Sequence, residues 1–372
     1  MVASPQSRSE RFRIAVLGCG RVAKRYREIF SDDLKTEVEV VAVSDPLPEA
    51  MEQFAAHFGA KTCSDRSGIV DAKPDFVCIL SKSGDHADDA RFFLEAGIGV
   101  VVEKPIALRP EQVVPLISLA RDKGLVYAVV QQNRYNPAIL KIREAIQEGR
   151  FGKLVLAGVR VHWSRPPAYY QDGWHGTWAM DGGILAQQAI HHLDALQWLA
   201  GPIEAVCAYG DHLVNPAEAE DTAAVLVRFK SGAMGTVEAT TAARPRDFEA
   251  SLTIVGEGGT AKIGGIALNE IQTWEFAAPK SGDDRVAKEF SQAVPSGMGL
   301  GHAAYFRDLF ATLRRGDIRA PVDATQGLHS LRFVHAIYAS MEQEGWVRMD
   351  EQPTSSRLGR VAKVIEHIRS RP

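Results

Sequence analysis

One stretch constrains this chain more than any other: an apolar run that ends in a glycine turn. Residues 14–17 (IAVL) are typical of a short strand buried on both faces, and Gly18-Cys19-Gly20 follows at once. A strand that feeds a glycine turn and then a helix directs backbone N–H groups at a pyrophosphate. Gly18 permits the tight turn, and Gly20 lets a phosphate approach the backbone. The cofactor contacts expected here are Gly18, Gly20, Arg21 and Val22.

A second apolar run supplies the other half of a dinucleotide fingerprint. Residues 38–44 (VEVVAVS) predict a buried strand, and Asp45 stands at its carboxyl end. An acidic residue there accepts hydrogen bonds from the adenosine ribose and repels a 2′-phosphate, so NAD is favoured over NADP. The alternative is a turn aspartate that precedes Pro46.

Strands and helices then alternate, which is typical of a doubly wound parallel α/β sheet. Helices are expected at 48–58, 87–96 and 111–123, and strands at 76–80, 99–102 and 126–131. This predicts a dinucleotide-binding domain over residues 12–132, preceded by a disordered tail at 1–11. The polar segment at 132–137 breaks the alternation and marks the boundary.

The second predicted domain, residues 133–372, has a different pattern of apolar and turn residues. After a helix at 138–148, strand-like segments joined by short turns predict an α+β domain with a large, mostly antiparallel, open sheet. The expected strands are 154–163, 205–213, 222–229, 234–241, 249–255 and 259–263. Residues 355–372 predict a basic helix with Arg360, Lys363, His367 and Arg369, and the expected role for it is packing against another subunit.

Polar residues follow the third and fourth strands of the predicted parallel sheet. Open parallel sheets bind ligands at this edge, so Ser81, Ser83 and His86 are expected to line the cofactor crevice; ordinary turn and cap chemistry is the alternative. Glu103-Lys104-Pro105 follows the next strand, and proline restricts the backbone before it. Lys104 can polarise a substrate hydroxyl there, or it is an ordinary surface lysine.

A predicted helix over 184–199 carries the second chemical signal. At 100° per residue, Gln187, His191 and Asp194 cluster on one face, whereas His192 lies beside the apolar stripe. Oxidation of a secondary alcohol requires a proton acceptor while hydride leaves the same carbon. His191 suits that step, with Asp194 to orient it and Lys104 to hold the oxygen. A histidine with a purely structural role is the alternative.

Bulk properties exclude several classes of function. The formal charge is −3, and the sequence has no basic stripe interleaved with aromatic residues, so nucleic-acid binding is not expected. The four cysteines lack metal-ligand spacing and suggest a reducing compartment, so no metal is expected. No apolar run approaches membrane-spanning length. The expected location is the cytoplasm.

Several motifs together resemble a known family. GCGRVA, Asp45, Glu103-Lys104-Pro105 and GGILAQQAIHHLD are similar to the glucose–fructose oxidoreductase, inositol dehydrogenase and rhizopine-catabolism (Gfo/Idh/MocA) family, from about residue 13 to 338. The resemblance implies that Lys104 and His191 serve substrate and catalysis.

A narrower resemblance joins QQNRYNPA, YYQDGWHGTWAMDGG and GLGHAAY to enzymes that oxidise the 3-hydroxyl of UDP-N-acetylglucosaminuronic acid for surface polysaccharides. It implies NAD, a nucleotide-sugar substrate and a homodimer or homotetramer built through the antiparallel sheet. The remaining cofactor contacts assigned are Glu103, Lys104, Gln132 and Trp174. The substrate contacts assigned are Asn133, Arg134, Tyr135, Arg160, Asp194 and His302.

Two residues depart from the pattern of that family. Gln187 replaces the usual Asn or Asp, and His175 replaces an Arg that often follows the tryptophan. Gln187 keeps its hydrogen-bonding groups but extends its reach by about 1.5 Å. His175 loses a fixed cation for phosphate or carboxylate. Both departures leave room for a substrate other than the uronic acid.

The hypotheses about function can therefore be ranked by how well they fit these residues. The first is an NAD-dependent dehydrogenase acting at C3 of a nucleotide sugar, with Lys104, His191 and Gln187 as the catalytic residues. The second is a dehydrogenase of a free sugar or inositol. A non-catalytic dinucleotide sensor and an NAD-using glycosidase remain as further alternatives.

Overall fold

The computed structural model describes residues 11–294 and 297–361, which separate into two compact units. The first unit comprises residues 11–107, 111–130 and 302–328; the second comprises 108–110, 131–294, 297–301 and 329–361. The chain thus returns to the first unit through 302–328, a return that the single predicted boundary after residue 132 did not include. Apart from Arg11, the expected N-terminal tail lies outside the described residues. Residues 355–361 form turns and bends, and the rest of the predicted basic helix lies outside them.

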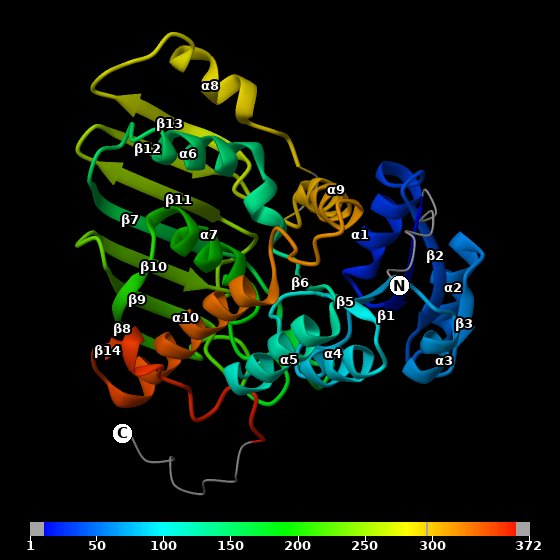
Figure 1. The fold of residues 1–372 in the computed structure, drawn as a ribbon. Helices are drawn as coiled ribbons and strands as arrows, with labels where there is room; N and C mark the ends of the chain where they lie inside the picture. Colours follow the sequence, from blue (N-terminus) through cyan, green and yellow to red (C-terminus); the bar gives the residue numbers. More distant parts are fainter. Residues whose placement is uncertain (1–10, 295–296, 362–372) are drawn as a thin grey trace, which may run out of the picture. The chain divides into compact units, whose positions relative to one another are not determined.

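The first unit is built on a six-stranded sheet in the order β3-β2-β1-β4-β5-β6, with every neighbouring pair parallel (Figure 1). This is the strand order of a doubly wound dinucleotide-binding fold, as predicted. The strands are β1 Phe12–Leu17, β2 Val38–Ser44, β3 Lys61–Cys63, β4 Phe76–Ile79, β5 Gly99–Val102 and β6 Tyr127–Val129. The helices are α1 Ala23–Glu28, α2 Pro48–Phe58, α3 Arg66–Asp71, α4 His86–Glu95, α5 Pro110–Lys123 and α9 Gly301–Arg314, the last from His302 onward.

The apolar runs explain why these strands lie in the middle of the sheet. All four residues of β4 and of β5 are buried, as expected for strands covered on both faces. The register then brings the carboxyl ends together, since Leu17 pairs with Ile79 and Ile79 with Val102. The glycine turn, the Ser81 loop and the Lys104 turn therefore begin at neighbouring points on one edge.

The second unit contains an eight-stranded sheet in the order β13-β12-β11-β7-β10-β9-β8-β14. Only β7 and β10 pair in parallel among these strands, so the predicted, mostly antiparallel sheet is confirmed. The strands are β7 Leu154–His162, β8 Ile203–Asp211, β9 Thr222–Phe229, β10 Met234–Thr240, β11 Glu249–Gly256, β12 Gly259–Gly264, β13 Glu270–Phe276 and β14 Val347–Arg348. The helices are α6 Pro137–Gln147, α7 Ile190–Ala200, α8 Asp283–Phe290 and α10 Ala324–Gln343, the last from His329 onward.

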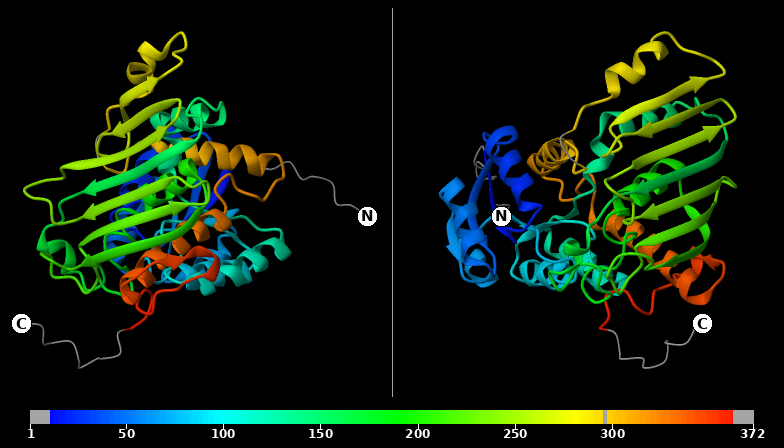
Figure 2. Two further views of the ribbon diagram at one scale, coloured as in Figure 1. Left: turned by 90° about the vertical axis from the view of Figure 1, so that its left-hand side faces the viewer. Right: turned by 180° about the vertical axis from the view of Figure 1, so that it is seen from behind.

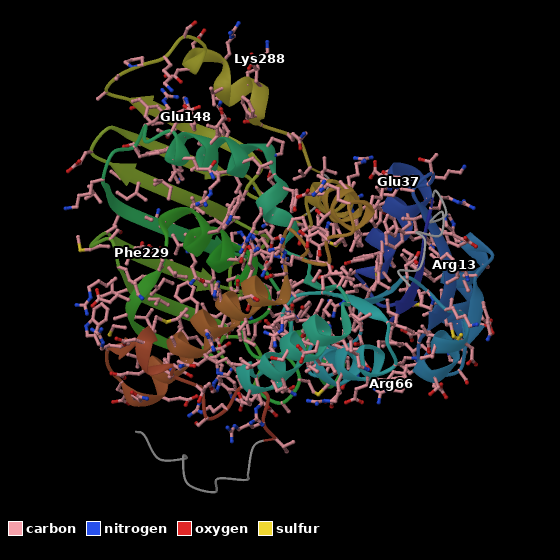
Figure 3. All side chains as sticks on the ribbon, viewed as in Figure 1. Arg13, Glu37, Arg66, Glu148, Phe229 and Lys288 are labelled. Carbon is pink, nitrogen blue, oxygen red and sulfur yellow. The ribbon has the colours of Figure 1, made fainter. Side chains whose placement is uncertain are left out.

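The two faces of this sheet differ. Along β9 buried and exposed residues alternate, so that Val225, Val227 and Phe229 enter the core, whereas Leu226 is exposed. Phe229 is labelled on this strand in Figure 3. Helices α6 and α7 lie over the core face in Figure 1, and the left view of Figure 2 presents the other face, over which no described helix of this unit lies. Tyr209 and Met234 are also exposed.

Candidate functional site

The glycine turn after β1 has the geometry that the sequence predicts. Gly18 adopts φ +98°, and a Cβ there would lie 2.6 Å from the backbone of Leu80, so this position requires glycine. A Cβ on Gly20 would meet no atom of the described residues within 4 Å. The protein's own packing therefore explains Gly18 but not Gly20, and the open space at Gly20 fits a pyrophosphate against the backbone. Arg21 and Val22 follow immediately, before α1.

Asp45 lies beside this turn. Its carboxylate accepts hydrogen bonds from the N–H groups of Cys19, at 2.6 Å, and Leu47, at 2.7 Å. The first bond joins the end of β2 to the glycine turn, so Asp45 shapes the turn in addition to its proposed contact with ribose. Burial, with the Asp45 charge, raises the pKa of the Cys19 thiol to about 12, which keeps the thiol protonated.

The loop after β4 is held from α4. The Ser81 hydroxyl donates to Asp89, at 2.7 Å, and Ser83 is buried. His86 was expected to line an open crevice, but it is only 1% exposed, and both its ring nitrogens face main-chain carbonyl oxygens. The expected orientation of His86 was therefore wrong. The first turn of α4 directs the imidazole inward between two loops instead of towards an open crevice.

Glu103, before Lys104, is the centre of a buried polar cluster in the first unit. Its carboxylate accepts from the Tyr26 hydroxyl at 2.8 Å and from the Lys104 N–H at 3.2 Å, and His302 Nε2 lies 3.8 Å away. Burial alone raises the pKa of Glu103, but His302, Lys104 and Tyr26 outweigh it, so the pKa is lowered. Glu103 is therefore ionised beneath the half-buried Lys104.

His302, assigned to the substrate, belongs to this cluster through the first turn of α9. It is 1% exposed, and its ring lies edge-on to Tyr26, with centroids 5.9 Å apart. Its Nδ1 has no hydrogen-bond partner among the described residues. An unpartnered buried nitrogen of this kind is expected to meet water or a ligand.

In the second unit, His191 is held by a residue that sequence reasoning missed. His191 Nδ1 lies 2.9 Å from the side-chain carbonyl oxygen of Gln131. Since that oxygen only accepts, Nδ1 carries a proton, so Nε2 is the ring nitrogen through which His191 can take up a substrate proton. Gln131 could have been proposed from the sequence, because it directly precedes Gln132, which was assigned to the cofactor. Both residues follow β6, the last strand of the parallel sheet.

Asp194 was expected to orient His191, and this was wrong. The Asp194 carboxylate forms two bonds of 2.7 Å with Arg134 and accepts a third from Ser330 at 2.6 Å. Asp194 is 2% exposed, so the pair is buried. Two residues assigned to the substrate thus bind each other and join the 132–135 turn to α7.

The predicted helix over 184–199 begins later than expected, at Ile190. Upstream, the Gly183 N–H donates to the Tyr338 hydroxyl, the Ile184 N–H to the Glu220 main chain, and the Leu185 N–H to the Glu220 carboxylate. These distant partners hold 183–185 outside the regular helix. Gln187 therefore lies in the turn before α7 and donates to Asp181, which in turn accepts from the Gly176 N–H.

The remaining assigned residues fall into two groups. Gln132 and Asn133 are buried, and the side-chain oxygens of both have no partner among the described residues, so they are available to a ligand. Tyr135 and Trp174 are half-buried, and His175 is buried beside Trp174 and paired with Asp172. Arg160 was misassigned: strand alternation puts Val159 and Val161 in the core and Arg160 on the opposite face from α7, paired with Glu238.

The described part of the chain offers neither a cluster of metal ligands nor a membrane-spanning helix. It contains no group of three or more His, Cys, Asp or Glu side chains able to hold a metal. No described helix is both long and apolar enough to cross a membrane.

Comparison with known families matches both units. Residues 12–131 match the oxidoreductase family with an NAD-binding Rossmann fold, and residues 139–262 match the GFO/IDH/MocA C-terminal domain. The family resemblance predicted from the sequence is therefore confirmed, as are the α/β fold class and NAD as the cofactor.

Solved structures and a curated relative are also similar to this chain. The WlbA dehydrogenase of Chromobacterium violaceum, in complex with NADH and UDP-GlcNAcA, is 34% identical with a TM-score of 0.85, over 94% of this chain and 99% of that one. The WlbA dehydrogenase of Bordetella pertussis, with the same two ligands, is 35% identical with a TM-score of 0.84, over 91% and 98%. The inositol 2-dehydrogenase of Rhizobium meliloti is 27% identical over 226 residues, which span 59% of this chain and 66% of that protein.

Proposed function

Because this chain belongs to the GFO/IDH/MocA family of NAD-binding oxidoreductases, we propose that it transfers hydride between a sugar secondary alcohol and NAD, and that the alcohol is C3 of a nucleotide sugar such as UDP-N-acetylglucosaminuronate. The observation that carries the reaction class is the hydrogen bond from His191 Nδ1 to Gln131, which leaves Nε2 as the proton acceptor.

The proposed reaction balances as alcohol plus NAD⁺ giving ketone, NADH and a proton. NAD, when bound to the glycine turn beside Asp45, supplies the hydride acceptor. His191 accepts the hydroxyl proton at Nε2. The Lys104 ammonium stabilises negative charge on the alcohol oxygen, and it also helps to hold the pKa of the adjacent Glu103 below its usual value.

Support for a nucleotide sugar comes from likeness over nearly the whole chain to two proteins that bind UDP-GlcNAcA. The buried side-chain oxygens of Gln132 and Asn133, which no described residue hydrogen-bonds, are suited to hydroxyl or amide donors of such a substrate. With this substrate, the enzyme would act in polysaccharide biosynthesis. A free polyol is the second candidate, favoured by the likeness to an inositol 2-dehydrogenase and by Gln187 and His175, which depart from the narrower pattern.

The test is the appearance of NADH absorbance when purified protein and NAD meet a panel of alcohols. The panel sets UDP-N-acetylglucosaminuronate and UDP-N-acetylglucosamine beside inositol and glucose. A signal with a uridine nucleotide alone supports the first proposal, and one with a free polyol alone supports the second. His191→Ala is the matched negative variant, and His212→Ala, an exposed histidine of the same unit, is its control. Failure of every alcohol to reduce NAD would contradict both.

We also propose that copies of the chain associate through the open face of the eight-stranded sheet. Tyr209, Leu226 and Met234 are 75%, 53% and 63% exposed there, and exposed apolar side chains gathered on one face are typical of a protein–protein interface. A cytoplasmic location is proposed because the four cysteines are free thiols and NAD is the cofactor. Light scattering of the purified chain tests the association.

A further inference from the structure

His86 bridges two loops of the first unit. The residue opens α4, and its ring is buried at 1% exposure. Its Nδ1 lies 2.7 Å from the carbonyl oxygen of Pro105, and its Nε2 lies 3.0 Å from that of Ser81. Both carbonyls are acceptors only, and burial lowers the pKa of His86, so the neutral ring donates its single N–H to one of them at a time while its other nitrogen rests against the second.

The two carbonyls belong to the two loops that follow β4 and β5. Ser81 comes two residues after the end of β4, and Pro105 comes directly after Lys104. The imidazole therefore spans from one loop to the other at the edge where parallel sheets bind their ligands. Its contact on the Lys104 side is one residue from the proposed catalytic lysine.

The Ser81 end of this bridge is itself fixed. The Ser81 hydroxyl donates to Asp89, three residues after His86 on the same helix, and Asp89 pairs with Arg66 at 3.0 Å (Figure 3 labels Arg66). On its other side, Leu80 lies so close to Gly18 that no Cβ fits between them. One continuous series of contacts therefore leads from the glycine turn through the Ser81 loop and His86 to the Lys104 turn.

We propose that His86 is a positioning residue, which sets the place of the Lys104-Pro105 turn relative to the cofactor-binding turn through its two carbonyl contacts. The catalytic meaning of this rests on the proposed function, since it takes Lys104 as a catalytic group. A displacement of about 1 Å at a positioning group lowers turnover by roughly 100-fold. A side chain that merely filled the same space would not need an N–H group facing a carbonyl oxygen.

The experiment compares His86→Ala with His57→Ala, an exposed histidine on α2 of the same unit. The readout is the rate at which acetic anhydride labels Lys104, measured by mass spectrometry with exposed Lys123 as internal reference. It needs no substrate, so it stays valid if the proposed substrate is wrong. We expect His86→Ala to raise labelling of the half-buried Lys104 by about threefold or more, and His57→Ala to leave it unchanged.

Added small molecules then separate bridging from packing. Imidazole has an N–H donor, whereas furan, of similar size, has none. Imidazole is expected to return Lys104 labelling in His86→Ala towards the native rate, whereas furan is not. Unchanged labelling in His86→Ala, or equal restoration by both compounds, overturns the proposal. If His86→Ala does not fold, His86→Gln, which retains volume and one donor group, is expected to change labelling in the same direction, and native labelling in it overturns the proposal.

Turnover gives the second readout once a substrate is known. We expect kcat of His86→Ala to fall about 10- to 100-fold while KM changes little, because the lost contact acts on a reacting group and not on substrate binding. Absence of turnover in the native protein would contradict the proposed function but leave the labelling result to decide the role of His86.

Discussion

His191 Nδ1 lies 2.9 Å from Oε1 of Gln131, a residue 60 positions earlier in the chain. The contact joins the first turn of α7 to the segment that follows β6. It fixes the ring orientation and also the tautomer, because an amide oxygen accepts and does not donate. A histidine held in this way presents Nε2 as a base without needing a carboxylate partner.

Replacement of Gln131 by Leu tests this relationship. Leucine is similar in size but accepts no hydrogen bond, so His191 loses control of its tautomer and orientation. We expect kcat/KM to fall about 10- to 100-fold with little change in NADH affinity. Steady-state NADH formation and a fluorescence titration measure the two quantities. Gln147→Leu, at an exposed position of α6, is the control. Native activity in Gln131→Leu would show that another contact orients His191.

The Arg134–Asp194 pair is expected to act on stability. Asp194→Ala removes three accepted hydrogen bonds, and with them the carboxylate that faces the buried guanidinium of Arg134. We expect a loss of about 3–5 kcal/mol in the free energy of unfolding, measured by urea denaturation. Glu238→Ala breaks the Arg160 pair, whose side chains are 50% and 44% exposed, and is expected to cost at most about 1 kcal/mol. Equal losses in both variants would contradict a structural role for Asp194.

The parts of the fold that the sequence predicted well are those with strong local signals. The helix Pro48–Phe58 and the strands Gly99–Val102 and Thr222–Phe229 have the expected bounds, because a proline at the helix start, a fully apolar run and a strict alternation each specify one structure. The start of α7 was wrong because its upstream amides are bound by Glu220 and Tyr338, which no local pattern reveals.

Among the site residues, those predicted from backbone geometry agree best with the structure. Gly18 requires its positive φ, and Asp45 lies beside the glycine turn. Pairings between distant segments were not predictable, since Arg134 and Asp194 are each plausible substrate contacts until the fold brings them together. Arg160 is a different error: the pattern Val159-Arg160-Val161 already indicates that the arginine faces away from the core.

Gly18 and Gly20 provide a matched pair of variants that separate folding from cofactor binding. Gly18→Ala puts a methyl group 2.6 Å from the Leu80 backbone at φ +98°, so we expect a large loss of thermal stability. Gly20→Ala meets no atom of the described residues within 4 Å, so its melting temperature should match that of the native protein. Its NADH dissociation constant is expected to rise about tenfold or more, about 1.4 kcal/mol, because the methyl group occupies the phosphate's approach. Unchanged NADH affinity in Gly20→Ala would place the pyrophosphate elsewhere.

Glu220 is expected to make the stability of the fold depend on pH. The residue is 4% exposed, and burial is the main reason that its pKa rises from 4.5 to about 8, with Asp181 adding repulsion. Since the folded pKa exceeds the unfolded one, folding favours the protonated acid. The contribution to stability is therefore complete below pH 4.5 and is lost as pH rises to about 8.

Glu220→Gln keeps the acceptor for Leu185 and Tyr338 but does not titrate. We expect the native protein to lose stability relative to Glu220→Gln between pH 5 and 8, on the order of 1 kcal/mol per pH unit, as measured by urea unfolding at several pH values. Glu218→Gln, at a partly exposed neighbouring carboxylate that binds the Trp178 N–H, is the control and should follow the native curve. Because Glu220 holds the segment before α7, its ionisation should also loosen the backbone around Gln187 and His191. We expect this as faster amide hydrogen exchange at 183–185 above pH 8 in the native protein than in Glu220→Gln. Parallel stability curves for native protein and Glu220→Gln would mean that Glu220 is already ionised in the fold.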